Sequence, residues 1–214
     1  MKKHWLLLIV IVALFLLLCW SLWWSNFGLR TVRYSAGGKT LPAGFEGFRI
    51  LQLSDLHSIS FGKDNKRLLQ MIRREEPDII VMTGDMVSRY DEDFSVTLAL
   101  CQALAVEYPV YYIRGNHEEG LEPAQWESYR AALAAAGVRL LDNETVRLTA
   151  ENGDTANLTG LWYKLDYYHQ YASHFRPVTE ETMYTILGEA PEGYNILLAH
   201  NPNYFPVYAA WGAD

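Results

Sequence analysis

Residues 48–85, FRILQLSDLHSISFGKDNKRLLQMIRREEPDIIVMTGD, alternate two kinds of apolar pattern. Residues 48–55 and 78–85 are short, largely apolar runs that end in aspartate, as expected for buried strands. Between them, residues 63–76 carry leucine and isoleucine at helical spacing, and a proline ends that helix. A strand, a helix and a second strand in this order predict two parallel strands joined by a crossover helix.

The same alternation continues along the rest of the chain. Further helices are predicted over residues 94–108, 122–137 and 179–191, and further strands over 109–116, 138–141, 145–148, 157–162 and 194–200. Strands and helices that alternate at these lengths predict an α/β domain with largely parallel strand pairing. In such domains ligands gather beyond the carboxyl ends of the strands, so the residues at those ends are the first candidates for a site.

A different pattern occupies the N-terminus. From Trp5 to Trp24 the chain runs without a charge, and at 1.5 Å per residue this run spans about 30 Å, the thickness of a bilayer core. Tryptophans stand at both ends of the run, where they favour the membrane interface. The run is longer than the apolar part of a cleaved signal peptide, and no small-x-small cleavage site follows it. We therefore predict an uncleaved, single-pass transmembrane helix.

These features divide the chain into three predicted parts. They are a transmembrane signal-anchor at residues 1–25, a linker at 26–47 and an α/β domain at 48–214, with the membrane contact made through residues 5–24. The basic residues before the apolar run favour a cytoplasmic N-terminus and an extracytoplasmic domain, although other basic residues follow the run.

Composition narrows the classes of partner. The net charge of −7 offers no basic face for nucleic acid, so we expect no nucleic-acid partner. The two cysteines do not form a disulfide framework, because Cys19 lies in the apolar run and Cys101 lies in a predicted helix, where a buried free thiol is expected. The sequence does not set an oligomeric state.

Polar residues with metal-ligating side chains stand at the ends of four predicted strands. Asp55 and His57 follow the first strand, Asp85 the second, Asn116 and His117 the third, and His200 the last. Taken singly, each has an ordinary structural explanation, because aspartate and asparagine favour turns and a lone strand-end histidine is commonly structural. It is improbable that separate structural reasons placed a metal-ligating residue type at all four strand ends. We expect these residues to meet at one rim of one sheet.

The chemistry of this set fits divalent metal ions. Carboxylates, imidazoles and an amide oxygen, without thiolates, suit manganese, iron or zinc. One carboxylate can bridge two metals, and two metals about 3.5–4 Å apart can clamp a phosphoryl group and activate a shared water as the nucleophile. Because His117 directly follows Asn116, it can lie at the site without being a ligand and can donate a proton or a hydrogen bond to phosphoryl oxygens.

Four motifs carry a family resemblance: LSDLH, TGD, RGNHE and LLAHNP, in this order. Over about residues 48–214 the chain resembles the calcineurin-like metallophosphoesterases, and most of all the membrane-associated bacterial members with one N-terminal transmembrane segment. The resemblance implies an α/β/β/α sandwich that hydrolyses phosphomonoesters or phosphodiesters by means of a metal-bridging hydroxide.

The resemblance also implies two bound divalent ions (Mn, Fe or Zn) and a role for each residue at a motif position. It implies that Asp55 and His57 bind one metal, that Asn116 and His200 bind the other, that Asp85 bridges both, and that His117 assists catalysis.

Two departures from the family pattern stand out. The second motif usually continues as GD-x-x-D, but Ser88 occupies the place of the last aspartate. The family closes with a Gly-His-x-His motif that supplies one histidine to each metal, and the sequence lacks this motif. His169 and His174 precede the fourth motif, so they stand in the wrong order to replace it. We therefore expect a C-terminally truncated domain with an exposed sheet edge and with weak or no activity.

The leading hypothesis is a membrane-anchored, dimetal phosphoesterase. The alternative is a catalytically inactive, membrane-tethered binding module that keeps the fold, whereas the acidic charge and the apolar run disfavour a soluble enzyme acting on nucleic acid. A phosphate ester is the expected substrate, and the anchor favours membrane-associated ones such as lipid-linked phosphates or pyrophosphates. The aromatic loop over residues 162–175 either lines an apolar substrate pocket or packs on its own domain.

Overall fold

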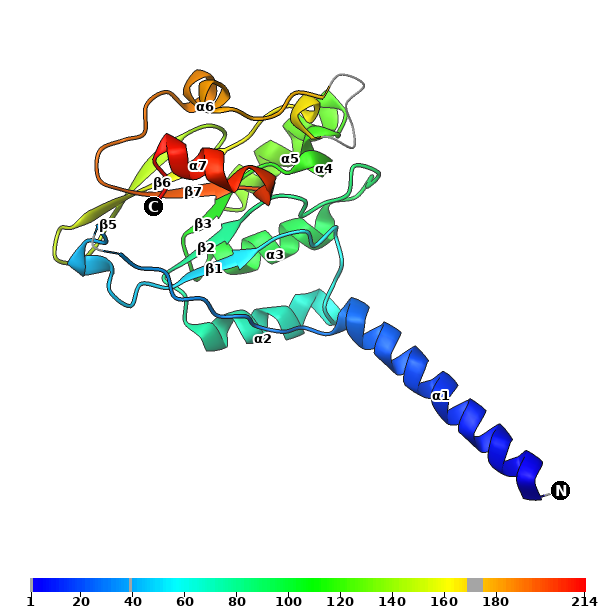
Figure 1. The fold of residues 1–214 in the computed structure, drawn as a ribbon. Helices are drawn as coiled ribbons and strands as arrows, with labels where there is room; N and C mark the ends of the chain where they lie inside the picture. The colour runs from blue at the N-terminus through cyan, green and yellow to red at the C-terminus, as the bar shows by residue number, and fades with distance from the viewer. Residues whose placement is uncertain (1, 39, 169–174) are drawn as a thin grey trace. The chain divides into compact units, whose positions relative to one another are not determined.

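The computed structural model describes residues 2–38, 40–168 and 175–214 (Figure 1). The chain forms two compact units, Met1–Ser35 and Ala36–Asp214. The first unit is built on one helix, α1 (Lys2–Phe27). Within it, His4–Ser25 has a mean hydropathy of 2.9 over its most apolar window and none of that window is buried, so this helix is long and apolar enough to cross a membrane.

A four-stranded parallel sheet forms the first half of the second unit. Its strands follow one another in chain order: β1 (Ile50–Leu53), β2 (Ile79–Met82), β3 (Val110–Tyr112) and β4 (Arg139–Leu140). The crossovers contain α2 (Lys66–Glu75), α3 (Ser95–Ala105) and α5 (Pro123–Ala135). Every residue of β2 is buried, as expected for a central parallel strand covered on both faces. The predicted strand–helix–strand unit at the start of the domain is confirmed.

A second sheet has three strands in the order β5 (Thr145–Thr149), β6 (Thr155–Leu161) and β7 (Tyr194–Ala199). A short turn joins β5 to β6, so these two strands pair antiparallel, whereas β7 returns after a long connection and pairs parallel to β6. Helices α6 (Glu180–Leu187) and α7 (Phe205–Trp211) lie over the outer face of this sheet (Figure 1).

The prediction of one rim of one sheet is therefore wrong. Three of the four strand ends belong to the first sheet, and the fourth, at β7, belongs to the second. The physical reason lies in β5, whose residues alternate between exposed and buried. Such a strand has one apolar face that another layer must cover, so it begins a sheet that stacks on the first instead of extending it.

Two apolar layers hold the sandwich together. Between the sheets lies a cluster of buried side chains: Phe45, Ile79, Val81, Ile113, Leu141, Val146, Leu148, Ala156, Leu158 and Leu198. Between the second sheet and its helices lies another: Leu161, Tyr163, Tyr168, Val178, Met183, Tyr208 and Trp211. With α2 and α3 against the free face of the first sheet (Figure 1), the order of layers is α/β/β/α, as the resemblance implied.

Parts of the predicted linker and of the aromatic loop pack on the domain. Phe45 is buried in the inter-sheet cluster and the Gly44 N–H donates to the Asp154 carboxylate at 2.8 Å, so the last residues of the predicted linker pack on the domain. The boundaries 1–25, 26–47 and 48–214 stay a prediction. In the described part of the aromatic loop, Tyr163 and Tyr168 belong to the core, which favours packing on the domain over a substrate pocket; residues 169–174 lie outside the described residues.

Close approach of the two sheets requires glycine at one position of β6. A Cβ on Gly160 would lie 2.2 Å from the carbonyl oxygen and 2.5 Å from the Cβ of Leu141. We expect Gly160→Ala to push the sheets apart and to lower stability by about 1–3 kcal/mol, or roughly 5 °C in melting temperature. Thermal unfolding of the purified full chain, followed by circular dichroism, measures the change.

Gly37→Ala is the matched control, because a Cβ at Gly37 would meet nothing within 4 Å. Its melting temperature should equal that of the unchanged protein. Equal melting temperatures for Gly160→Ala and Gly37→Ala would contradict the tight inter-sheet contact at β6.

Candidate metal centre

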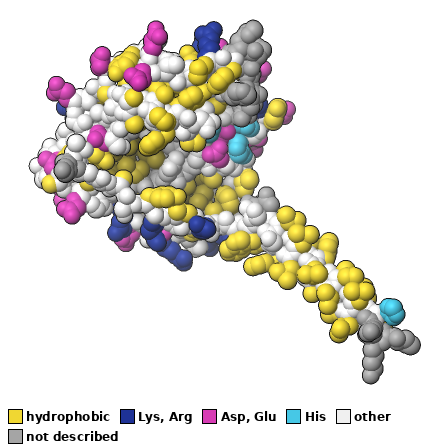
Figure 2. Space-filling model, viewed as in Figure 1, with side chains coloured by type: hydrophobic (Ala, Val, Ile, Leu, Met, Phe, Trp, Pro, Cys, Tyr) yellow, Lys and Arg dark blue, Asp and Glu magenta, His cyan; other side chains and the backbone are white. Residues whose placement is uncertain are grey.

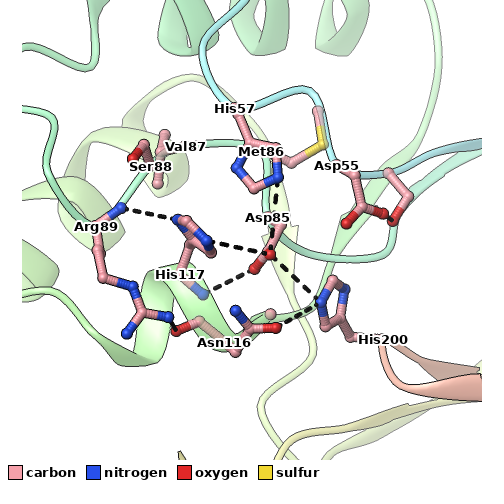
Figure 3. Close-up of polar contacts among 12 residues, drawn as sticks. Asp55, His57, Asp85, Met86, Val87, Ser88, Arg89, Asn116, His117 and His200 are labelled. Carbon is pink, nitrogen blue, oxygen red and sulfur yellow. Dashed lines mark hydrogen bonds and ion pairs between the residues drawn. The ribbon is translucent and has the colours of Figure 1, made fainter. Parts of the chain in front are cut away.

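All six residues selected from the sequence meet in space (Figure 3). The Asp85 carboxylate lies at their centre: its Oδ2 is 3.9 Å from Nε2 of His57, 3.9 Å from Nε2 of His117 and 3.5 Å from Nε2 of His200. The side chain of Asp85 is only 5% exposed, whereas that of His57 is 36% exposed. The cluster therefore opens to solvent on the side of the first motif and is closed on the side of His200, whose side chain is 8% exposed.

Two glycines bring the second and third motifs into contact. A Cβ on Gly84 would lie 2.4 Å from the Gly115 nitrogen, and a Cβ on Gly115 would lie 2.2 Å from Oδ1 of Asp85. Gly84 also has a φ of +91°, which side chains with a Cβ rarely adopt. The glycines of TGD and RGN are thus needed so that the two loops can close around the Asp85 carboxylate.

The first motif is fastened to the second by a short ladder of backbone hydrogen bonds. The N–H groups of Asp55, His57 and Ser58 donate to the carbonyls of residues 84, 85 and 86 at 3.1, 3.0 and 2.9 Å. Asp55, His57, Ser58 and Asp85 all have φ between 45° and 57°, in the left-handed region. Residues other than glycine persist there only when their surroundings hold them, so the ladder keeps the candidate ligands in a strained arrangement.

His200 reaches the cluster from the second sheet with its ring fixed. Its Nδ1 lies 2.8 Å from the Thr83 carbonyl oxygen and donates to it, so in the neutral ring the lone pair is on Nε2. That lone pair faces Oδ1 of Asn116 at 3.1 Å and Oδ2 of Asp85. Three acceptors that point at one another repel unless a proton or a cation lies between them.

Charge in this cluster follows the same logic. Burial lowers the pKa of His200, but its contacts with the Asp85 carboxylate outweigh that effect and raise the pKa to about 9. Burial raises the pKa of Asp85, yet the contacts with His200 and with the His117 N–H bring it below its ordinary value. Asp85 is therefore an anion that holds positive charge on His200, and a divalent ion suits the position of the His200 proton.

His117 has the opposite polarity. The Arg89 backbone N–H donates to Nδ1 of His117 at 3.1 Å, so the neutral ring carries its proton on Nε2, the atom that faces Asp85. Burial, more than any other factor, lowers the pKa of His117. An N–H pointing into the cluster cannot bind a metal, which separates His117 from the lone-pair donors around it.

Asp91 holds the segment that carries the Arg89 N–H. At the place where the family usually has an aspartate, the Ser88 N–H donates to Oδ2 of Asp91 at 2.8 Å, and the Ser58 hydroxyl donates to the same atom at 2.6 Å. The segment after the second motif is thus held by Asp91, and the next backbone N–H, that of Arg89, becomes the partner of His117.

The donor atoms fall into two groups that share one residue. Ligand atoms of His57, Asp85 and His117 lie within 4.8 Å of one another, and so do those of Asp55, Asp85 and His200. A shared carboxylate with oxygen and nitrogen donors on both sides fits two divalent ions, and the polarity of His117 removes it from the ligand set. The other members of the two groups are Asp55, His57, Asp85 and His200, and Oδ1 of Asn116 lies 3.1 Å from Nε2 of His200. Their assignment as metal ligands stays a prediction.

Sequence reasoning missed Glu118, which organises the site from beneath. Its side chain is buried, and its two oxygens accept hydrogen bonds from four backbone N–H groups and one hydroxyl. The donors are the N–H groups of Asp85, Met86, Val87 and Gly115, at 2.8 to 3.3 Å, and the hydroxyl of Tyr112, at 2.6 Å. Burial raises the pKa of Glu118, but five donors on one carboxyl favour its ionised form.

A second overlooked residue, Arg114, braces the RGN loop from outside. Its guanidinium lies 4.2 Å from the ring centre of Trp126 and 3.9 Å from that of Trp162, and it forms ion pairs with Asp142 and Glu119. The RGNHE motif contains both Arg114 and Glu118, but many of their partners, such as Asp85, Trp126 and Asp142, are distant in the sequence, so the sequence alone does not reveal these contacts.

The sequence is also similar to those of known metallophosphoesterases. The sequence model described as "Calcineurin-like phosphoesterase" matches residues 48–214. The chain is 26% identical over 137 residues to the metallophosphoesterase YkuE of Bacillus subtilis, covering 62% of this chain and 47% of that protein. It is 28% identical over 165 residues to YkoQ of the same organism, covering 76% of this chain and 56% of YkoQ.

A further relative, from Danio rerio, is described as a "Transmembrane protein with metallophosphoesterase domain". It is 26% identical to this chain over 170 residues, covering 76% of this chain and 37% of that protein. The chain spans about half the length, or less, of these curated relatives.

The role of Glu118 gives a stability prediction. Glu118→Gln keeps the shape but turns one acceptor into an N–H₂ group that faces backbone donors. We expect a loss of about 3 kcal/mol in the free energy of unfolding, because buried N–H groups lose their partner. Denaturant unfolding of the full chain measures this loss. Glu127→Gln, on an exposed side chain of α5, should change stability by less than about 0.5 kcal/mol; equal effects of the two changes would contradict the role of Glu118.

Proposed function

This chain belongs to the calcineurin-like phosphoesterase family, and we propose that its domain hydrolyses phosphate esters at the cluster centred on Asp85. The observation that carries the proposal is the buried Asp85 carboxylate, whose Oδ2 lies within 3.9 Å of the Nε2 atoms of His57, His117 and His200, with Asp55 in the same cluster. Phosphate esters are anions, and negative charge must be stabilised in the transition state when the phosphoryl group is transferred to water. Two divalent ions bound at the site would neutralise part of that charge. Both phosphomonoesters and phosphodiesters fit this chemistry.

We propose the following assignment of the ligands to the two ions. Following the family pattern, Asp55 and His57 would hold one ion and Asn116 and His200 the other, with Asp85 shared. The 3.1 Å contact between Nε2 of His200 and Oδ1 of Asn116 supports the second pair, whereas the ligand atoms of Asp55 also lie within 4.8 Å of those of His200. Manganese, iron and zinc all suit such carboxylate, imidazole and amide donors. Ions bound there would supply Lewis-acid stabilisation of the phosphoryl oxygens and would lower the pKa of a bound water.

We assign to His117 a catalytic role that follows from its tautomer. The Arg89 N–H holds the imidazole so that Nε2–H points into the cluster. From there it can donate a hydrogen bond to a phosphoryl oxygen and stabilise negative charge on it as the bond to the leaving group breaks. The side chain of His117 is 18% exposed, so a substrate entering from the open side can reach it.

The anchor narrows the candidate substrates. Helix α1 is suited to a single membrane crossing, which we propose places the domain on the extracytoplasmic side of the membrane. A hydrolytic centre held at a bilayer surface encounters lipid-linked phosphates and pyrophosphates at high local concentration. We propose these as the substrate class.

Removal of the shared carboxylate tests the site. In the full chain, purified in detergent, stripped of metal and reloaded with Mn²⁺, Asp85→Asn should lower bound metal from about two ions per chain to one or none. Hydrolysis of an aryl phosphodiester or phosphomonoester should fall by at least about 100-fold. Metal analysis and release of the coloured phenol measure the two effects. Unchanged metal content and robust activity in Asp85→Asn would overturn the assignment.

His117→Gln separates catalysis from metal binding. Because His117 is not a ligand, the variant should keep the metal content of the unchanged chain. Its kcat should fall by about 100-fold or more, since a positioned donor to the transferred group is lost. Two tightly bound ions without turnover in the unchanged chain would instead favour the non-catalytic binding module. A loss of metal in His117→Gln would show that His117 is a ligand.

A further inference from the structure

One face of α2 carries a concentration of positive charge. Lys66, Arg67, Gln70, Arg73 and Arg74 recur at helical spacing and are all exposed, while Leu68, Leu69 and Ile72 on the opposite face are buried. Lys63, just before the helix, is exposed as well. In Figure 2, dark-blue side chains gather along the edge of the domain where Figure 1 places α2. We call the five cationic side chains, Lys63, Lys66, Arg67, Arg73 and Arg74, the α2 basic face.

Nearby acids neutralise only part of this charge. Arg73 forms an ion pair with Glu107, and the acid at the end of the helix, Glu76, pairs with Arg49. Asp64 is exposed beside Lys63. Lys63, Asp64, Lys66 and Arg73, with Leu69 at the base, line a shallow groove of about 400 Å³. Lys63 and Lys66 at this groove can each form a charge-assisted hydrogen bond to a phosphate group.

The basic face contrasts with the rest of the domain. All acidic residues of the chain lie after Ser35, whereas four of its basic residues lie before that point, so the domain is more acidic than the net charge of −7 indicates. An anionic surface therefore repels most of the domain and attracts α2. The domain is also joined covalently to a helix suited to a membrane, which keeps it beside the bilayer.

From these observations we propose that the α2 basic face docks the domain on an anionic membrane surface, with lipid phosphates contacting Lys63, Lys66, Arg67, Arg73 and Arg74. The partner is the phosphate of anionic lipid headgroups. The proposal rests on α1 as a membrane helix and does not depend on hydrolysis. His57 precedes Lys63 by six residues, so docking keeps the open side of the cluster within at most about 20 Å of the headgroups.

Lysine labelling in the full chain tests the docking. The chain is reconstituted in nanodiscs of phosphatidylcholine alone or mixed with phosphatidylglycerol, and acetylation at each lysine is followed by mass spectrometry. Labelling of Lys63 and Lys66 should slow by about fivefold or more in the anionic discs and recover in about 0.5 M NaCl, which screens surface charge. Lys164, exposed elsewhere on the domain, is the internal control and should not change.

Two paired variants sharpen the result. Arg67→Gln/Arg74→Gln removes two charges from the α2 basic face and should restore most labelling of Lys66 in anionic discs. Arg139→Gln/Arg147→Gln removes two exposed charges elsewhere and should leave the protection intact. Circular dichroism confirms that both variants fold. Equal labelling of Lys63 and Lys66 in neutral and anionic discs, or equal protection of Lys164, would overturn the proposal.

Free glycerol phosphate added to neutral discs distinguishes a membrane surface from a soluble anion. It should give little protection of Lys63 and Lys66, because a single phosphate lacks the charge density of a lipid surface. Protection as strong as that in anionic discs would assign the groove to a soluble phosphate compound and would overturn membrane docking.

Discussion

The convergence of five hydrogen-bond donors on the buried carboxylate of Glu118 is the contact on which the site depends. Through it, the N–H groups that follow Asp85 and the N–H of Gly115 are fixed on one anchor. A carboxylate with this many donors is stable in a buried place where an unpaired one would not be. Because Asp85 and Gly115 belong to the second and third motifs, the relative position of these motifs is set before any side chain at the rim meets a ligand.

The remaining features of the site follow from that anchor. Once the two loops touch, only glycine fits at positions 84 and 115, and the Asp85 carboxylate lies where three imidazoles can approach it. Backbone groups then decide the polarity of the rings: the Thr83 carbonyl leaves His200 with a lone pair toward the centre, and the Arg89 N–H leaves His117 with a proton there. In their neutral forms, these chemically identical side chains thereby become an acceptor and a donor beside the same carboxylate.

Many residues of the site could be predicted from the sequence because they directly follow apolar strands. Apolar strands ending in Asp55, Asp85 and Asn116 are visible as patterns, and parallel strands bring their ends together. What escaped prediction depends on contacts between distant segments. The partners of Glu118 come from three different stretches, the second sheet follows from the one-sided burial of β5, and the tautomer of His117 depends on a backbone group 28 residues away. None of these features produces a recognisable pattern in the sequence.

The placement of His200 on the second sheet has a mechanical consequence. Its ring reaches across to Thr83 and Asn116, which lie beyond the ends of β2 and β3 of the first sheet. An ion held by residues of both layers would act as a cross-link between them, so that separating the sheets would require releasing the ion. The free energy of binding the ion would then add directly to the free energy needed to separate the two sheets.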